Sequence, residues 1–261
     1  MAAGRFEKVA CTELREEYEK FVKENFFWLE DYALYMSCKD FHEGRAWLDW
    51  ADSYRKPTAS AKKRMRKQFA EDVKYYYFVQ FMFHKEWLEL KEYANENGIK
   101  IIGDLPIYVA LDSADVWANP KNFIMDEQNI PTVVAGCPPD AFSKDGQLWG
   151  NPVYNWDLMK KDNYSWWKDR ISLALSLFDG VRIDHFRAFE SFWAVKGDAK
   201  TAKEGKWVKG PGMKLINALK SVSGDKLIIA EDLGDITEDV VKLVNDSGFP
   251  GMRVFQFGFL S

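Results

Sequence analysis

The residues best able to do chemistry lie in the stretch 178–187, Phe-Asp-Gly-Val-Arg-Ile-Asp-His-Phe-Arg. Its Asp-Gly pair is typical of a turn, and the β-branched valine and isoleucine that follow favour a short buried strand. Because side chains alternate along a strand, Arg182 and Asp184 are predicted to point to the same side. A guanidinium beside a carboxylate favours the charged form of the acid and fixes its angle. This stretch therefore predicts a nucleophile or a metal ligand at Asp184, with a structural ion pair as the alternative.

Two other stretches repeat this layout. Residues 99–103, Ile-Lys-Ile-Ile-Gly, run into Asp104, and residues 226–230, Lys-Leu-Ile-Ile-Ala, run into Glu231. Each is an apolar strand pattern that follows a helical pattern and ends at an acid. Acids at the ends of successive βα strands are how a (β/α) barrel builds a site on its C-terminal face. Three such acids indicate a site more strongly than one does.

The elements around these strands are mostly helical. Periodic apolar residues predict helices over 12–38, 59–97 with a possible break, 163–178, 211–222 and 237–247, and a fourth strand is predicted over 251–257. A closed barrel needs eight parallel strands. The predicted fold class is therefore α/β, a partial (β/α)8 TIM barrel of about four parallel strands with helical insertions, truncated at both ends. The predicted domains are a helical insertion subdomain over 1–98 and a partial barrel over 99–261.

Two segments between these elements lack a clear period. Residues 123–156 contain tryptophan and several prolines but few charges, which favours an ordered binding loop over the strand ends. Residues 196–210 are polar and rich in glycine and lysine, which favours a mobile loop near the site. Aromatic residues make up 16% of the chain, and flat aromatic faces are a usual platform for sugar rings, so Trp149 in the first loop is predicted to be such a platform, with a core residue as the alternative, whereas Trp117 is predicted to be a core residue.

Composition narrows the function class. The 261 residues carry a net charge of −4, so nothing here favours a nucleic-acid partner, and the basic run at 62–67 fits a solvated helix face. The three cysteines, Cys11, Cys38 and Cys137, form no CxxC pair, which argues against a disulfide framework and a zinc site. No stretch of 18 apolar residues and no signal-peptide core is present, so we expect no membrane association and a cytoplasmic location.

Four stretches together resemble one known family. They are Gly-Asp-Leu-Pro-Ile-Tyr-Val-Ala at 103–110, the loop at 134–154, Val-Arg-Ile-Asp-His-Phe-Arg at 181–187 and Ala-Glu-Asp-Leu-Gly at 230–234. In order, spacing and sequence they resemble the 4-α-glucanotransferases, also called amylomaltases or disproportionating enzymes, of glycoside hydrolase family 77 in the α-amylase clan. The resemblance covers almost the whole chain. It implies a (β/α)8 barrel that transfers α-1,4-glucan segments onto maltodextrins or glucose, without a cofactor or a metal.

The resemblance also implies residue roles. Asp184 matches the nucleophile, Glu231 the general acid/base and Arg182 the arginine that holds the nucleophile. Asp104 and His185 match residues that line the donor subsite. The loop that covers the bound glucan in the family is matched by Asp140, Ser143, Gln147, Trp149 and Asn151.

Simple physical chemistry agrees with these roles. A retaining mechanism needs two carboxyl groups roughly 5–5.5 Å apart, which neighbouring strand ends can supply. The acid/base must hold a proton near neutral pH, so the pKa of Glu231 is expected to be raised. The family's third catalytic carboxylate lies in a histidine-aspartate motif that none of the 30 residues after Glu231 (261 − 231) matches. We therefore expect the chain by itself to be inactive or nearly so.

Three alternatives remain open at this point. An α-amylase-like hydrolase would share the nucleophile and the acid/base, and a non-catalytic glucan-binding protein could use part of a barrel. A metal-dependent barrel enzyme could bind Mg²⁺ through Asp104, Asp184 and Glu231, although Arg182 already supplies a cation there. Open strand edges would also allow self-association.

Overall fold

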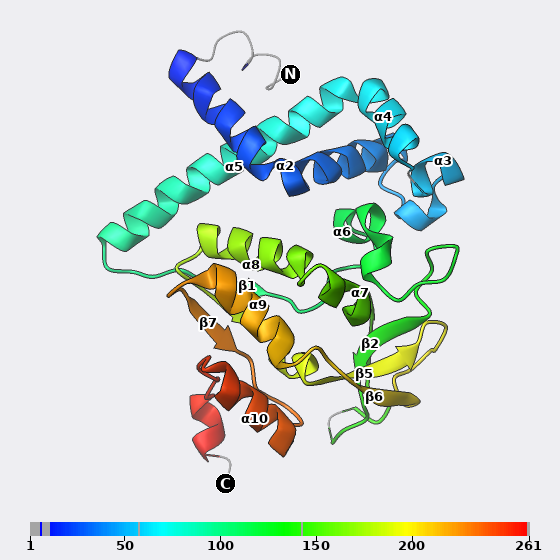
Figure 1. The fold of residues 1–261 in the computed structure, drawn as a ribbon, viewed down its shortest axis with the longest axis vertical. Helices are drawn as coiled ribbons and strands as arrows, with labels where there is room; N and C mark the ends of the chain where they lie inside the picture. Colours follow the sequence, from blue (N-terminus) through cyan, green and yellow to red (C-terminus); the bar gives the residue numbers. More distant parts are fainter. Residues whose placement is uncertain (1–5, 7–10, 57, 142, 260–261) are drawn as a thin grey trace. The chain divides into compact units, whose positions relative to one another are not determined.

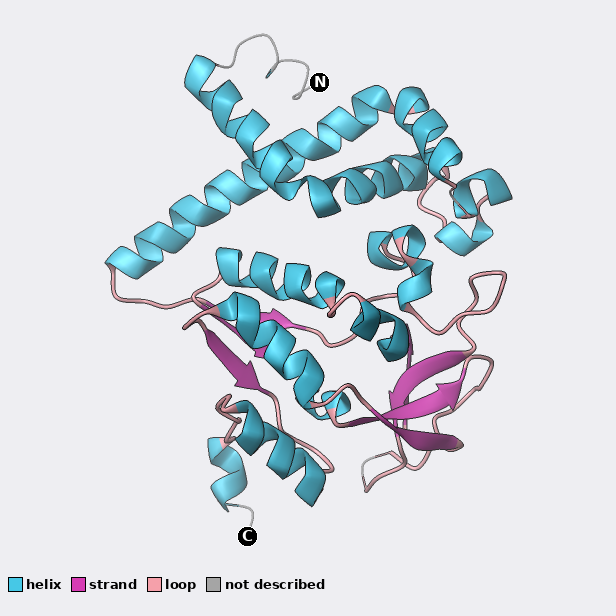
Figure 2. Cartoon of the chain, in the orientation of Figure 1, coloured by secondary structure: helices cyan, strands magenta, loops and turns pink. Residues whose placement is uncertain are grey.

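The computed structural model of the chain describes residue 6 and residues 11–56, 58–141 and 143–259. These residues form two compact units. One unit comprises residues 1–90 with 110–120, and the other comprises residues 91–109 with 121–261. The predicted boundary near residue 98 between an insertion subdomain and a barrel portion stays a prediction. Figures 1 and 2 show the course of the chain and its secondary structure.

The first unit is built from helices. They are α2 (Thr12–Phe41), η1 (Trp47–Asp49), α3 (Asp52–Arg55), α4 (Ala59–Gln68), most of α5 (Ala70–Glu96) and α6 (Ala114–Ala118). The predicted break in the long second helix is confirmed at Phe69, which lies between the last residue of α4, Gln68, and the first residue of α5, Ala70. Trp117 is only 1% exposed, which confirms that it is a core residue. Asp112 ties the α6 segment to α2, because it accepts hydrogen bonds from Tyr35 (2.6 Å) and Lys39 (2.5 Å).

The second unit contains a three-stranded parallel sheet in the order β1-β4-β7. Its strands are β1 (Ile102–Leu105), β4 (Gly180–Ile183) and β7 (Leu227–Ala230). The helices of this unit are α7 (Trp156–Lys161), α8 (Ser165–Leu177), α9 (Met213–Ser223) and α10 (Glu238–Ser247), with 3-10 turns at η3 (Phe186–Phe189) and η4 (Phe255–Phe259), and a further 3-10 turn, η2 (Pro120–Asn122), begins at the last residue of the first unit. α8 packs against β1 and β4 and lies beside α9 (Figure 1). Val181 and Ile183 are fully buried, so Arg182 between them points to the opposite face of the sheet.

Two predicted strands need correction. β1 begins at Ile102 rather than at residue 99, because the Ile99 amide donates to the Ala94 carbonyl at the end of α5 and Ile101 pairs with Asp179 outside the strand ladder. The predicted strand over 251–257 is wrong: Gly251 forms only an isolated parallel bridge with Ala230, and η4 follows. The parallel sheet therefore has three strands rather than about four within the described residues. The α/β class with mixed helices and sheets is confirmed.

The two segments expected to be loops instead form much of a second sheet. This antiparallel sheet has the order β3-β2-β5-β6, with β2 (Val133–Cys137), β3 (Gln147–Pro152), β5 (Ser191–Lys196) and β6 (Gly205–Lys209). Its core contains Val134, Val195 and Ala202. The expected irregular loop over 123–156 is thus organised around a β2–β3 hairpin, and most of the expected mobile loop over 196–210 is the β5–β6 hairpin. Among the described residues, no helix is long and apolar enough to cross a membrane.

Candidate active site

Strand register brings the predicted acids to one edge of the parallel sheet. Asp104 lies opposite Arg182 on β4, and Ile183 lies opposite Ala230 on β7. Asp184 and Glu231 therefore each follow directly after a strand end. The ladder continues through both residues, because the Asp184 amide donates to the Leu105 carbonyl (3.0 Å) and the Glu231 amide donates to the Ile183 carbonyl (3.1 Å). Ladder bonds of this kind fix the main chain of both acids, which is the positioning that a catalytic pair needs.

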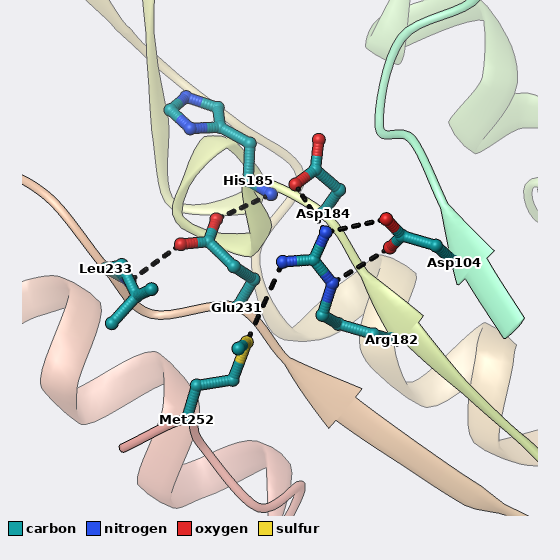
Figure 3. Close-up of polar contacts among 7 residues, drawn as sticks. All are labelled: Asp104, Arg182, Asp184, His185, Glu231, Leu233 and Met252. Carbon is teal, nitrogen blue, oxygen red and sulfur yellow. Dashed lines mark hydrogen bonds and ion pairs between the residues drawn. The ribbon is translucent and has the colours of Figure 1, made fainter. Parts of the chain in front are cut away.

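Arg182 lies between two carboxylates (Figure 3). Its Nε and Nη2 donate to the two oxygens of Asp104 at 2.9 and 2.6 Å, and Nη2 also donates to Asp184 Oδ1 at 3.2 Å. The fork-to-fork contact with Asp104 is the stronger geometry, and it raises the pKa of Arg182 further above its usual range. The prediction that Arg182 and Asp184 share one side is confirmed. The main partner of Arg182, however, is Asp104.

Glu231 is held by two main-chain amides. The His185 amide donates to its Oε2 (2.8 Å) and the Leu233 amide donates to its Oε1 (3.0 Å). Burial raises the pKa of Glu231 above its ordinary value, and the nearby charge of Asp184 adds to the rise. The two amides and Arg182 act in the opposite direction, since they favour the anion. The direction of this pKa shift is the one expected of a general acid.

His185 contributes to the site through its main chain and its ring separately. Its backbone is left-handed, with φ 51° and ψ 44°, and this conformation directs its N–H at Glu231. The imidazole points away from that carboxyl (Figure 3). The ring meets the indole of Trp149 edge to face, with 4.8 Å between ring centroids. Burial, aided by the charge of Arg187, lowers the pKa of His185 to about 4, so its ring is neutral near pH 7.

The antiparallel sheet and its turn hold the remaining predicted residues. Trp149 lies on β3 with 36% of its surface exposed, and its Nε1 donates to Gln147 (3.1 Å). The side-chain Nδ2 of Asn151 donates to the Val109 carbonyl (2.9 Å), which joins β3 to the segment after β1. In the turn between β2 and β3, the Asp140 carboxylate accepts the Ser143 amide (2.7 Å). Trp149 contacts the ring of His185, whose main-chain amide donates to Glu231, so Trp149 lies close to the acids. That these residues contact a glucan stays a prediction.

The arrangement can support acid/base chemistry beside a fixed carboxylate. Glu231 carries the raised pKa that proton transfer requires, and Asp184 is oriented by a guanidinium. Within the described residues, no group of three or more His, Cys, Asp or Glu side chains is placed to hold a metal ion. Arg182 occupies the space between Asp104 and Asp184, so the cation between these two acids is a side chain of the protein itself.

Sequence reasoning missed several contributors to the site. The Leu233 amide could not be assigned because main-chain donors leave no residue-type signal. Met252, whose sulfur lies 3.8 Å from Arg182 Nη1, is brought in by the bridge at Gly251. Arg187 belongs to the motif at 181–187 but received no role. A weak signal was available, since Arg187 lies between Phe186 and Ala188 in an apolar stretch close to a strand end.

The fold and the site define an α/β protein with a pair of carboxyl groups, one of them suited to acid/base work, at the carboxyl ends of parallel strands. The chain belongs to the 4-α-glucanotransferase family, glycoside hydrolase family 77, whose model matches residues 1–261. The resemblance expected from the motifs is therefore confirmed.

Curated relatives carry the same description. The chain is 49% identical over 245 residues to a 4-α-glucanotransferase of Streptococcus pneumoniae. The aligned region covers 94% of this chain and 48% of that protein. It is 47% identical over 254 residues to a 4-α-glucanotransferase of Thermus thermophilus, with 97% and 51% covered. The chain thus spans about half the length of these relatives.

Solved structures agree with this assignment. An amylomaltase from Streptococcus agalactiae in complex with acarbose is similar with a TM-score of 0.92 and 41% identity, over 99% of this chain and 52% of that one. An amylomaltase from Corynebacterium glutamicum has a TM-score of 0.72 at 17% identity over 93% of this chain, and this likeness concerns the fold alone.

Proposed function

We propose that the chain carries the nucleophile and the acid/base of a retaining 4-α-glucanotransferase. The observation that carries the proposal is the placement of Glu231, with its raised pKa, beside the arginine-held Asp184 at adjacent strand ends. The names of the curated relatives and the acarbose bound to the similar amylomaltase support a glucan substrate.

The chemistry follows from this geometry. Asp184 attacks the anomeric carbon of the donor glucan while Glu231 gives its proton to the leaving oxygen, which forms a glycosyl ester on Asp184. Glu231, now charged, then takes the proton of the 4-hydroxyl of an acceptor sugar, and this oxygen displaces Asp184. The His185 and Leu233 amides stabilise the anionic form of Glu231 between the two steps.

The finer fold assignment is part of the same proposal. The order β1-β4-β7 with packed helices fits an arc of a (β/α)8 barrel with its site at the carboxyl ends of the strands. The division into a helical insertion over 1–98 and a barrel portion over 99–261 is proposed with it. The cytoplasmic location and self-association expected from the sequence remain predictions.

The direct test is disproportionation of maltotriose, with glucose and longer maltodextrins followed together. We expect the chain alone to give little product. In a chimera in which this chain replaces the matching segment of the Streptococcus pneumoniae relative, we expect longer maltodextrins that disappear with Asp184→Asn. Glucose and maltose without longer products would favour the hydrolase alternative. A folded chimera that makes no product while the parent enzyme is active would contradict the proposal.

A further inference from the structure

Arg187 is a buried cation two residues after His185. Its residue surface is only 3% exposed, although it carries a permanent charge and lies on the short turn η3. A buried charge is costly unless it is paired and hydrogen-bonded. The partners that the guanidinium contacts therefore indicate what it holds in place.

The first partner is the segment that follows β7. Arg187 Nη1 donates to the main-chain carbonyl of Asp235 and lies 3.6 Å from the carboxylate of the same residue. Asp235 comes two residues after Leu233, whose amide donates to Glu231, and Gly234 turns the chain between them at φ +88°. Arg187 thus fixes the far end of the turn that supplies one of the two amides on Glu231.

The other partners belong to the antiparallel sheet. Nη2 donates to Ser191 Oγ (3.1 Å) at the start of β5, and the guanidinium carbon lies 4.0 Å from the ring centroid of Trp207 on β6. Trp207 is 40% exposed, so its indole separates the buried guanidinium from solvent. Such a cation–π contact is strongest where the cation is desolvated.

We propose that Arg187 is a positioning residue that fastens the turn at 231–235 to the antiparallel sheet and thereby keeps the Leu233 amide on the Glu231 carboxyl. It acts through Asp235 and through main-chain geometry rather than on the substrate. Only the role given to Glu231 rests on the proposed function, because the joining of the turn to the sheet is independent of any glucan.

The test uses NMR of the chain itself, with amide hydrogen exchange and carboxyl titration as readouts. In Arg187→Met we expect the exchange protection of the Leu233 amide to fall at least tenfold and the pKa of Glu231 to rise, because an amide that favours the anion is loosened. Arg187→Lys keeps the charge but not the planar fork, so we expect a smaller change in the same direction. A matched control is Arg170→Met: Arg170 also lies over tryptophan rings and donates to carbonyls, at Pro106 and Ile107.

A second pair of variants keeps the test decisive if Arg187→Met does not fold. Trp207→Leu removes the aromatic cover from an exposed position, whereas Trp207→Phe retains a ring face. We expect loss of Leu233 protection with leucine and near-normal protection with phenylalanine. The proposal would be overturned if Leu233 stayed fully protected in Arg187→Met, or if protection fell equally at the Ile228 amide in β7. It would also fail if Trp207→Leu left Leu233 unchanged. None of these readouts depends on glucan transfer, so they are separate from the test of function.

Discussion

At the scale of single residues, the site depends on main-chain donors as much as on side chains. Glu231 is flanked by the amides of His185 and Leu233, and the first of these requires a left-handed backbone at a residue that is not glycine. Asparagine adopts this conformation readily, whereas β-branched residues do so at a cost of about 1–2 kcal/mol. The backbone role of His185 can therefore be separated from the role of its ring.

Replacing His185 by valine and by asparagine separates its backbone role from the role of its ring, because both variants lose the imidazole. His185→Val is expected to lower the free energy of unfolding by about 1–2 kcal/mol more than His185→Asn does, because valine disfavours the left-handed region. The pKa of Glu231 should rise further in the valine variant as the amide is misdirected. Urea unfolding and carboxyl NMR measure the two effects. Equal behaviour of both variants would show that the conformation at residue 185 is unimportant.

The depressed pKa of His185 predicts how stability depends on pH. The imidazole has an ordinary pKa of 6.5 when unfolded but of about 4 in the fold, so between these values the unfolded state binds the extra proton. Stability should therefore fall as pH drops from 6.5 towards 4, by roughly 2–3 kcal/mol at most. Urea unfolding at pH 7 and pH 5 should show this loss in the native chain and a smaller loss in His185→Asn. An identical loss of stability in the native chain and in His185→Asn would show that protonation of His185 is not the cause.

At the scale of elements, the parallel strands were predictable and the antiparallel sheet was not. β7 is a continuous apolar run and β4 carries β-branched residues on either side of Arg182, and each strand has an acid directly after it, which is a local signal. The contact between Asp104 and Arg182 joins residues 78 positions apart and depends on register, which no local pattern contains. The strands β2, β3, β5 and β6 show no regular alternation of buried and exposed residues, so they are defined by their pairing with one another rather than by a local sequence period.

Gly103 on β1 shows how packing constrains an element. A Cβ at this position would lie 2.2 Å from Cδ2 of Phe178, so the ring occupies the space that glycine leaves. Gly103→Ala is expected to destabilise the fold by about 1–3 kcal/mol through overpacking, measured by chemical unfolding. Gly258→Ala, with nothing within 4 Å of the added carbon, serves as the control. In a Phe178→Ala background the cost of Gly103→Ala should shrink, and an unchanged cost would refute the packing explanation.

At the scale of the whole molecule, the chain belongs to a family whose curated members are about twice as long. The second unit alone supplies Asp104, Arg182, Asp184, His185 and Glu231, together with the sheet that carries Trp149. The motifs predicted this gathering of acids, because neighbouring parallel strands end at one edge. They did not predict that much of the segment expected to cover the strand ends would belong to an antiparallel sheet.

The most direct test of the account is chemical trapping of the intermediate on Asp184. In the chimera described above, Glu231→Gln should slow release of the sugar, because no base remains to activate the acceptor. With an α-glucosyl fluoride donor, which needs no acid to leave, mass spectrometry should show one glycosyl group on the peptide that contains residues 181–187. The same adduct should be absent when Asp184→Asn is added. A glycosyl group on any other residue, or one that persists with Asp184→Asn, would contradict the assignment of Asp184 as the nucleophile.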